Sequence, residues 1–277
     1  MVAQSKNIHI PPLPKVAREI MSLLYRPEPD FAQLVRIIAT DAGLCGDIFK
    51  LSNSAQAGAQ QSTTNLMTAV SRLGLTTLRL LVMMHAMSTS FKLHLNCGID
   101  NMEYWRHGAF VGHIAFELSK IRFKEHAADM QLAGLLHDAG VLILATHEPE
   151  NLKTQIELCR KSGTSLAHLE LNTGAEAHRK LSKQLVESWG LSLTVGMLVG
   201  LHDVTDHNRR GVLTATQHQL VDILILSDSL AHRYGFGLNQ YKGNVTFSSQ
   251  NLQTVGIGST EILAAVQTVK SFLTHVS

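Results

Sequence analysis

The sequence is short of cysteine and of charged residues, and both shortages limit the kind of protein it can be. Its three cysteines, Cys45, Cys97 and Cys159, form no CxxC pair. An odd number of cysteines at wide spacing indicates reduced thiols in a cytoplasmic protein, where they serve as small apolar residues. Charged residues make up 17% and hydrophobic residues 45% of the chain, which is typical of a globular protein rather than a disordered or coiled-coil one.

Long apolar runs and dense basic runs are also missing. The segment from Met1 to Ile10 has no basic stretch followed by an apolar one, and no run approaches the roughly 20 apolar residues that cross a bilayer. We therefore expect a cytoplasmic chain with no membrane partner. The net charge is only +2 and the densest basic run, Asn208-Arg209-Arg210, is short, so no nucleic-acid partner is expected.

Apolar residues at helical spacing, in contrast, occur almost throughout the chain. Val16, Ile20 and Leu24 mark one face of a first helix, which Pro27 ends. Gly74 can end a later helix in a left-handed C-cap. Strand signals are nearly absent, so the predicted fold class is all-α. From residue 66 onward, helices are predicted at about 66–73, 75–91, 102–122, 127–145, 151–161, 165–171, 175–188, 192–201, 214–233 and 259–276.

One segment interrupts this helical pattern. From Leu93 to Asp100 the chain contains Gly98 and shows little periodicity, which is typical of a loop between two helical parts. A chain of 277 residues can form one large domain or two small ones. We predict an N-terminal helical subdomain over residues 1–97 and a second helical subdomain over residues 98–277.

The pair His137-Asp138 lies in the middle of a strongly apolar stretch, Leu132–Leu142. Burying a charged or polar side chain is unfavourable unless it is paired, hydrogen-bonded or bound to a metal. Nothing nearby in the sequence satisfies the pair, so partners must come from other parts of the fold. The alternative is a helix end turned toward solvent, with Asp138 acting in a turn before Gly140.

Four further residues favour a metal site over that alternative, because each is a potential ligand on a predicted helix of its own. Together with the pair they give the order H…HD…H…H…D. Imidazole nitrogens and carboxylate oxygens can both hold a transition metal, and an aspartate can bridge two ions. The four residues are His107, His178, His202 and Asp228.

The sequence resembles a known family, the HDOD proteins or "HD-related output domains", which are related to the HD phosphohydrolases. The resemblance covers about Ile10 to Leu230 and rests on several fragments in the family's order. These fragments are Pro11-Pro12-Leu13-Pro14, Leu51-Ser52-Asn53-Ser54-Ala55, Arg72-Leu73-Gly74-Leu75, Trp105-Arg106-His107, Gly134-Leu135-Leu136-His137-Asp138 and Trp189-Gly190-Leu191.

The resemblance implies an N-terminal helical bundle packed on an HD-like helical bundle that carries the ligands. The superfamily's metal-ligand order matches all six positions in this chain, although many HDOD proteins have lost part of the set and are regarded as signalling or scaffolding modules. The implied cofactor is one or two divalent transition-metal ions. Such a donor set suits Fe, Mn, Co, Ni or Zn better than Ca and does not choose among them. The implied ligands are His107, His137, Asp138, His178, His202 and Asp228.

The chain departs from the related HD-GYP cyclic dinucleotide phosphodiesterases. It has His202-Asp203 where those enzymes have two consecutive histidines, and no Asp-x-Gly-Tyr-Pro stretch follows. Cyclic-di-GMP hydrolysis is therefore not expected, although residues 203–208 could supply other ligands. The sequence has no glycine-rich phosphate loop. Basic residues that could bind a substrate are Arg106, Lys120, Arg122 and Arg179.

Three functions remain open on these grounds. The first is a signal-transduction module that binds signalling proteins or a ligand such as a phosphorylated small molecule or nucleotide, with a metal site in its HD-like half. The second is a metal-dependent phosphohydrolase in which a water activated by the metal attacks phosphorus, with Asp138 as the catalytic residue. The third is a domain whose cation contributes only to folding.

The remaining histidines, including His113, His207 and His232, are predicted to be surface or capping residues.

Overall fold

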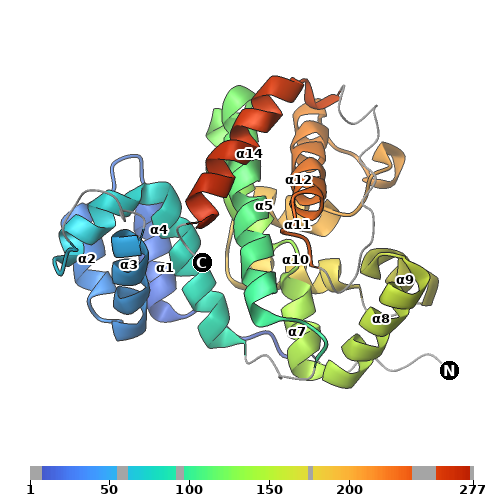
Figure 1. Ribbon diagram of the computed structural model, residues 1–277, viewed down its shortest axis with the longest axis horizontal. Coiled ribbons are helices and arrows are strands. Elements are labelled where there is room, and N and C mark those ends of the chain that lie inside the picture. The colour runs from blue at the N-terminus through green and yellow to red at the C-terminus, as the bar shows by residue number, and fades with distance from the viewer. Residues whose placement is uncertain (1–7, 55–61, 92–96, 174–176, 239–253, 275–277) are drawn as a thin grey trace. The chain divides into compact units, whose positions relative to one another are not determined.

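The structure is a computed structural model that describes residues 8–54, 62–91, 97–173, 177–238 and 254–274 (Figure 1). Every regular element in these ranges is a helix, and they contain no strand. The predicted all-α class is therefore confirmed. The chain divides into two compact units, one built from Met1–Ile10 and Phe91–Val269 and the other from Pro11–Ser90 and Lys270–Ser277.

Between Pro11 and Ser90, the described residues of the smaller unit form four helices, and the ends of two of them follow from local chemistry. The carboxylate of Asp30 accepts a hydrogen bond from the Gln33 backbone N–H and so caps the second helix. Gly74 has a φ of 73°, and this left-handed residue breaks the last helix where the sequence predicts a C-cap. The helices are α1 (Lys15–Leu24), α2 (Phe31–Ile38), α3 (Ala42–Ser54) and α4 (Leu66–Ser90).

The larger unit contains the six predicted ligands. Helices α5 and α6 cross closely, since a Cβ placed on Gly134 of α6 would lie 2.6 Å from the Cα of Gly112 on α5. Helix α12 packs on α5, and α10 packs on both α7 and α11. The helices are α5 (Asn101–Arg122), α6 (Ala127–Leu136), α7 (Ala139–His147), α8 (Pro149–Ser162), α9 (Leu166–Thr173), α10 (His178–Ser188), α11 (Leu193–Leu201), α12 (Ala215–Arg233) and α14 (Ser259–Thr274), with 3-10 turns at Lys124–His126 and His207–Arg209.

The prediction of one continuous helix over 127–145 is wrong at residues 137 and 138. Helix α6 ends at Leu136 and α7 begins at Ala139, so His137 and Asp138 form a junction between the two helices. Both residues are nevertheless buried, with 1% and 7% of their surface exposed. The pair is thus neither inside a helix nor turned toward solvent.

Two stretches, Leu66–Ser90 and Lys124–His147, are long and apolar enough to cross a membrane by length and composition alone. Core helices of water-soluble proteins satisfy the same criterion. In Lys124–His147, 89% of the most apolar window is buried within the protein, as expected of a core element. For Leu66–Ser90 the buried share is 33%.

Candidate metal centre

All six predicted ligands come together inside the larger unit. The junction supplies His137 and Asp138, three helices supply one residue each, and the end of a fourth supplies His202. His107 lies on α5, His178 is the first residue of α10, His202 directly follows α11, and Asp228 lies on α12. Their side chains are between 1% and 11% exposed, so the cluster lies almost entirely within the core.

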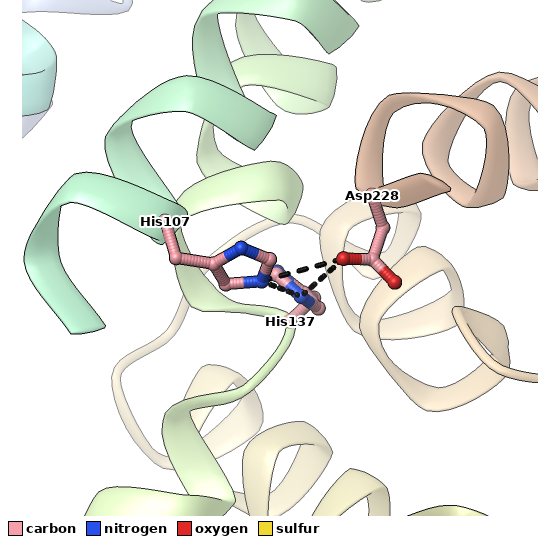
Figure 2. A group of neighbouring side chains, drawn as sticks. All are labelled: His107, His137 and Asp228. Atoms are coloured by element: carbon pink, nitrogen blue, oxygen red, sulfur yellow. Dashed lines mark hydrogen bonds and ion pairs between the residues drawn. The ribbon is translucent and has the colours of Figure 1, made fainter. Parts of the chain in front are cut away.

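Three of the residues form a first triad, which Figure 2 shows. The Nε2 atoms of His107 and His137 are 3.2 Å apart. The Oδ1 atom of Asp228 lies 3.3 Å from His107 Nε2 and 3.9 Å from His137 Nε2. One ligand atom from each residue therefore faces a common point (Figure 2).

The other three residues form a second triad. The Nε2 atoms of His178 and His202 are also 3.2 Å apart. Each lies 3.5 Å from Oδ1 of Asp138. The second triad therefore repeats the first, with two imidazoles and one carboxylate.

Asp138 links the two triads because its two oxygens face different ones. Its Oδ1 belongs to the second triad, whereas its Oδ2 lies 3.5 Å from His137 Nε2 and 3.8 Å from His107 Nε2 in the first. A carboxylate placed in this way can bridge two cations.

The outer nitrogen of each histidine fixes the orientation of its ring. Three Nδ1 atoms lie 3.0 Å or less from a backbone carbonyl oxygen: that of Phe236 for His107, of Gly134 for His137 and of Val199 for His202. A carbonyl oxygen only accepts, so each Nδ1 carries the proton and donates it. Histidines that bind metals are held in this way, with Nε2 left to act as the ligand.

His178 is held by a carboxylate instead of a carbonyl. The buried Glu170 accepts one hydrogen bond from His178 Nδ1 at 2.8 Å and a second from the His178 backbone N–H at 3.0 Å. Burial opposes protonation of the imidazole, but the Glu170 carboxylate together with Asp138 and Asp203 outweighs it, and the pKa of His178 rises to about 9. In the absence of a metal, the imidazole of His178 is therefore protonated on both ring nitrogens and positively charged at neutral pH.

The first triad contains one histidine that is neutral at pH 7. Burial lowers the pKa of His137 to about 4, although Asp138 opposes the shift, so this ring is neutral at pH 7. Its Nε2 lone pair faces the corresponding nitrogen of His107 at 3.2 Å, and Asp228 Oδ1 beside them accepts no hydrogen bond from any residue that the structure describes. Electron-rich atoms held this close favour a cation between them, so the donor set fits a divalent transition metal.

The charge of Asp138 suits the same role. Burial alone would raise its pKa, but His137, with His178 and His202, holds the pKa of this carboxyl well below its usual range. The carboxylate is therefore ionised throughout the neutral range, as a metal ligand must be.

Two residues near the cluster were not expected from the sequence. Glu170 lies in the short helix α9, where nothing in the sequence distinguishes it from a solvated acid. His232, predicted to be a surface residue, is on α12 one turn after Asp228, and its Nε2 lies 3.5 Å from Asp228 Oδ1. The i, i+4 spacing from Asp228 was the available signal for His232.

The other candidates have different partners. Of the possible additional ligands in residues 203–208, Asp203 pairs with Arg179 at 2.9 Å and His207 with the buried Asp222 at 2.9 Å. His113 is buried, with 7% exposure, so its prediction as a surface or capping residue is wrong with respect to exposure. Burial lowers the pKa of His113 to about 4.

Comparison with known proteins gives a direct family match. The HDOD domain model matches residues 10–204. This chain belongs to the HDOD family. An uncharacterized protein of Treponema pallidum (strain Nichols) is 25% identical over 199 residues, which are 72% of this HDOD chain and 38% of that protein. The chain thus spans well under half the length of this relative.

Solved structures share the HDOD fold at low identity. An HDOD domain protein of unknown function from Geobacter sulfurreducens has a TM-score of 0.73 at 19% identity, covering 97% of this chain and 91% of that one. A protein from Marinobacter aquaeolei VT8, provisionally named a signal transduction protein, has a TM-score of 0.77 at 21% identity, covering 96% and 59%. A provisionally named phosphohydrolase from Shewanella amazonensis SB2B has a TM-score of 0.67 at 19% identity, covering 96% and 95%.

Proposed function

We propose that this HDOD protein holds two divalent transition-metal ions and is a metal-dependent phosphohydrolase. The observation that carries the proposal is the position of Asp138, which places one oxygen in each of two triads. His107, His137 and Asp228 would hold one ion, His178 and His202 the other, and Asp138 both. Fe, Mn, Co, Ni and Zn all suit this donor set.

Two ions held by these residues would lower the pKa of a water molecule and would neutralise charge that develops on a phosphoryl group. The chain's own contribution is to keep the donors fixed and dry. The three backbone carbonyls and Glu170 hold the rings in one tautomer, so no reorganisation is needed when substrate arrives. The phosphohydrolase name of one solved relative agrees with this chemistry.

The first experiment is metal analysis of the protein as purified, followed by assay of the Mn- and Fe-loaded protein on a broad panel of phosphoesters. We expect about two ions per chain and turnover of at least one phosphoester. Asp138→Asn removes the bridging charge with little change of volume, and should lose both the metal and the turnover while remaining folded. Glu157→Gln, which removes an exposed negative charge from α8, is the matched control. A folded, fully loaded protein that hydrolyses no member of the panel would refute the enzymatic assignment.

A second function is supported by one observation, the burial of the cluster. With side chains no more than 11% exposed, the metal centre offers little surface to a bulky substrate. In this case the protein is a cytoplasmic signal-transduction module that binds signalling proteins, and the ions respond to or stabilise its conformation. This second function predicts that metal changes the binding of a partner protein without any turnover of a phosphoester. A purely structural cation is distinguished by a loss of thermal stability on chelation with partner binding intact.

A further inference from the structure

A second polar site lies in the larger unit, outside the metal cluster. A cavity of about 440 Å³ is bounded by α9, α10, the end of α11 and the residues that follow α11. None of the six cluster residues lines it. Its volume falls within the roughly 300–1,000 Å³ typical of small-molecule sites.

The cavity lining is rich in positive charge. Four basic side chains line it, whereas the acidic lining residues are Asp203 and Asp206, so the formal excess is two positive charges (four minus two). The basic residues are Arg179, Lys180, Lys183 and Arg209. This is a local concentration of charge in a chain whose net charge is only +2.

The acidic residues are already engaged, but not all of the basic ones are. Arg179 pairs with Asp203 at 2.9 Å, and the Asp206 carboxylate accepts a hydrogen bond from the Asn208 backbone N–H. Within the described part of the chain, Lys180 and Arg209 form no ion pair. An anion entering the cavity would therefore meet cations that have not been neutralised.

The side chain of Lys183 packs against Gly200. A Cβ at Gly200 of α11 would lie 3.0 Å from Cδ of Lys183, so the absence of a side chain lets the lysine stem lie against the helix. Lys183 is one of the residues that line the cavity, and its stem can pack in this way while the ammonium group stays in water. The same group lies 3.8 Å from the exposed Glu187, a distance at which a solvated pair contributes little.

We propose that this cavity binds the phosphate monoester group of a small molecule about the size of a mononucleotide, at a site separate from the metal cluster. A phosphate monoester carries close to two negative charges near neutral pH, which matches the excess of two cations. Arginine and lysine are the usual phosphate-binding residues, and the cavity lining offers Lys180 and Arg209 in addition to Arg179, which pairs with Asp203. The site does not depend on the metal.

The test is calorimetric titration of the full chain with adenosine 5′-monophosphate and with adenosine, in the presence of EDTA and with Mn added. We expect the monophosphate to bind in both conditions and adenosine to bind at least tenfold more weakly. The double substitution Lys180→Gln with Arg209→Gln should weaken binding of the monophosphate at least tenfold. Lys124→Gln with Lys161→Gln, which removes two exposed lysines outside the cavity, should leave it unchanged.

Three outcomes would overturn the proposal. If EDTA abolishes binding, the phosphate sits on the metal centre and not in the cavity. If the Lys180 and Arg209 substitutions have no more effect than the control pair, the cavity is not the site. If adenosine binds as well as the monophosphate, or neither binds, the cavity does not recognise a phosphate group.

Discussion

Each cluster histidine uses its two ring nitrogens for different tasks, Nδ1 for its own orientation and Nε2 for the centre. The ligand types and their order can be read from the sequence, since His107, His178 and Asp228 are polar residues on predicted helices. The groups that accept hydrogen bonds from the Nδ1 atoms cannot be read from the sequence. Three are backbone carbonyls, which carry no sequence signal, and the fourth is Glu170, one acid among many.

Glu170 should determine how well the second triad holds its ion. In Glu170→Gln, a single amide oxygen replaces two acceptors, and the amide NH₂ group would face one of the donors of His178. Loss of such an outer partner lowers metal affinity roughly 10- to 100-fold. Competition with a chromophoric chelator measures the change. Glu157→Gln on the surface of α8 is the control, and equal affinities for the two variants would contradict the role assigned to Glu170.

His113 should make the protein less stable in mild acid. Its folded-state pKa of about 4 lies below the ordinary histidine value of 6.5, so unfolding takes up a proton between these pH values and the free energy of unfolding falls as the pH falls. The full effect of a shift of this size is on the order of 3 kcal/mol. Between pH 6.5 and 4, in chelator, the wild type should lose about that much more stability than His113→Leu, as measured by denaturant unfolding. Parallel losses in the two proteins would exclude this explanation.

At the scale of elements, the junction between α6 and α7 positions both residues of the pair. The periodicity of apolar residues predicted one continuous helix where the structure has two. The reason is that apolar residues continue from Leu132 to Leu142 on both sides of the break. At the break, His137 contributes to the first triad and Asp138 faces both triads, so both residues have partners from other helices. A local sequence pattern contains no information about such partners.

The start of α7 depends on a glycine. A Cβ at Gly140 would overlap the carbonyl oxygen of His178 at the start of α10, and the Gly140 N–H donates to Ser182 Oγ at 2.7 Å. Gly140→Ala should therefore force α10 away, lower the free energy of unfolding by about 2 kcal/mol or more, and weaken metal binding. Thermal unfolding and metal analysis of the same preparation test both effects.

Gly196→Ala in α11 is the matched control for this prediction. A Cβ there would meet only Val186 Cγ1, at the ordinary contact distance of 3.8 Å. Removing a glycine from a helix interior stabilises it by roughly 0.5–1 kcal/mol. A Gly140 variant as stable as the Gly196 variant would show that the close approach of α7 and α10 is unimportant.

At the scale of the whole molecule, the candidate metal centre belongs to one of two compact units. The six predicted ligands all lie in the unit that contains Phe91–Val269, and α1 to α4 have a core of their own that includes Ile20, Leu34 and Ile48. The sequence predicted two helical parts from a stretch of weak periodicity. The assignment of Lys270–Ser277 to the unit of Pro11–Ser90 had no local signal.

Metal should therefore stabilise the two units unequally. A ligand that binds only the folded state raises stability where it binds, and local opening reports this by hydrogen exchange. On adding Mn to chelated protein, we expect slower amide exchange in α5, α6, α10 and α12 and little change in α1 to α4. Asp138→Asn should show no metal-dependent slowing anywhere. Equal protection of both units would mean that they unfold as a single cooperative body.

The position of Asp138 also means that the two triads cannot be independent. Whatever binds at one oxygen alters the charge and orientation of the other, so occupancy of either triad changes the affinity of its neighbour. By thermodynamic reciprocity the change is the same in both directions. If both triads bind metal, a half-loaded protein is a distinct state, and the concentration of metal at which the second ion binds determines which state is present.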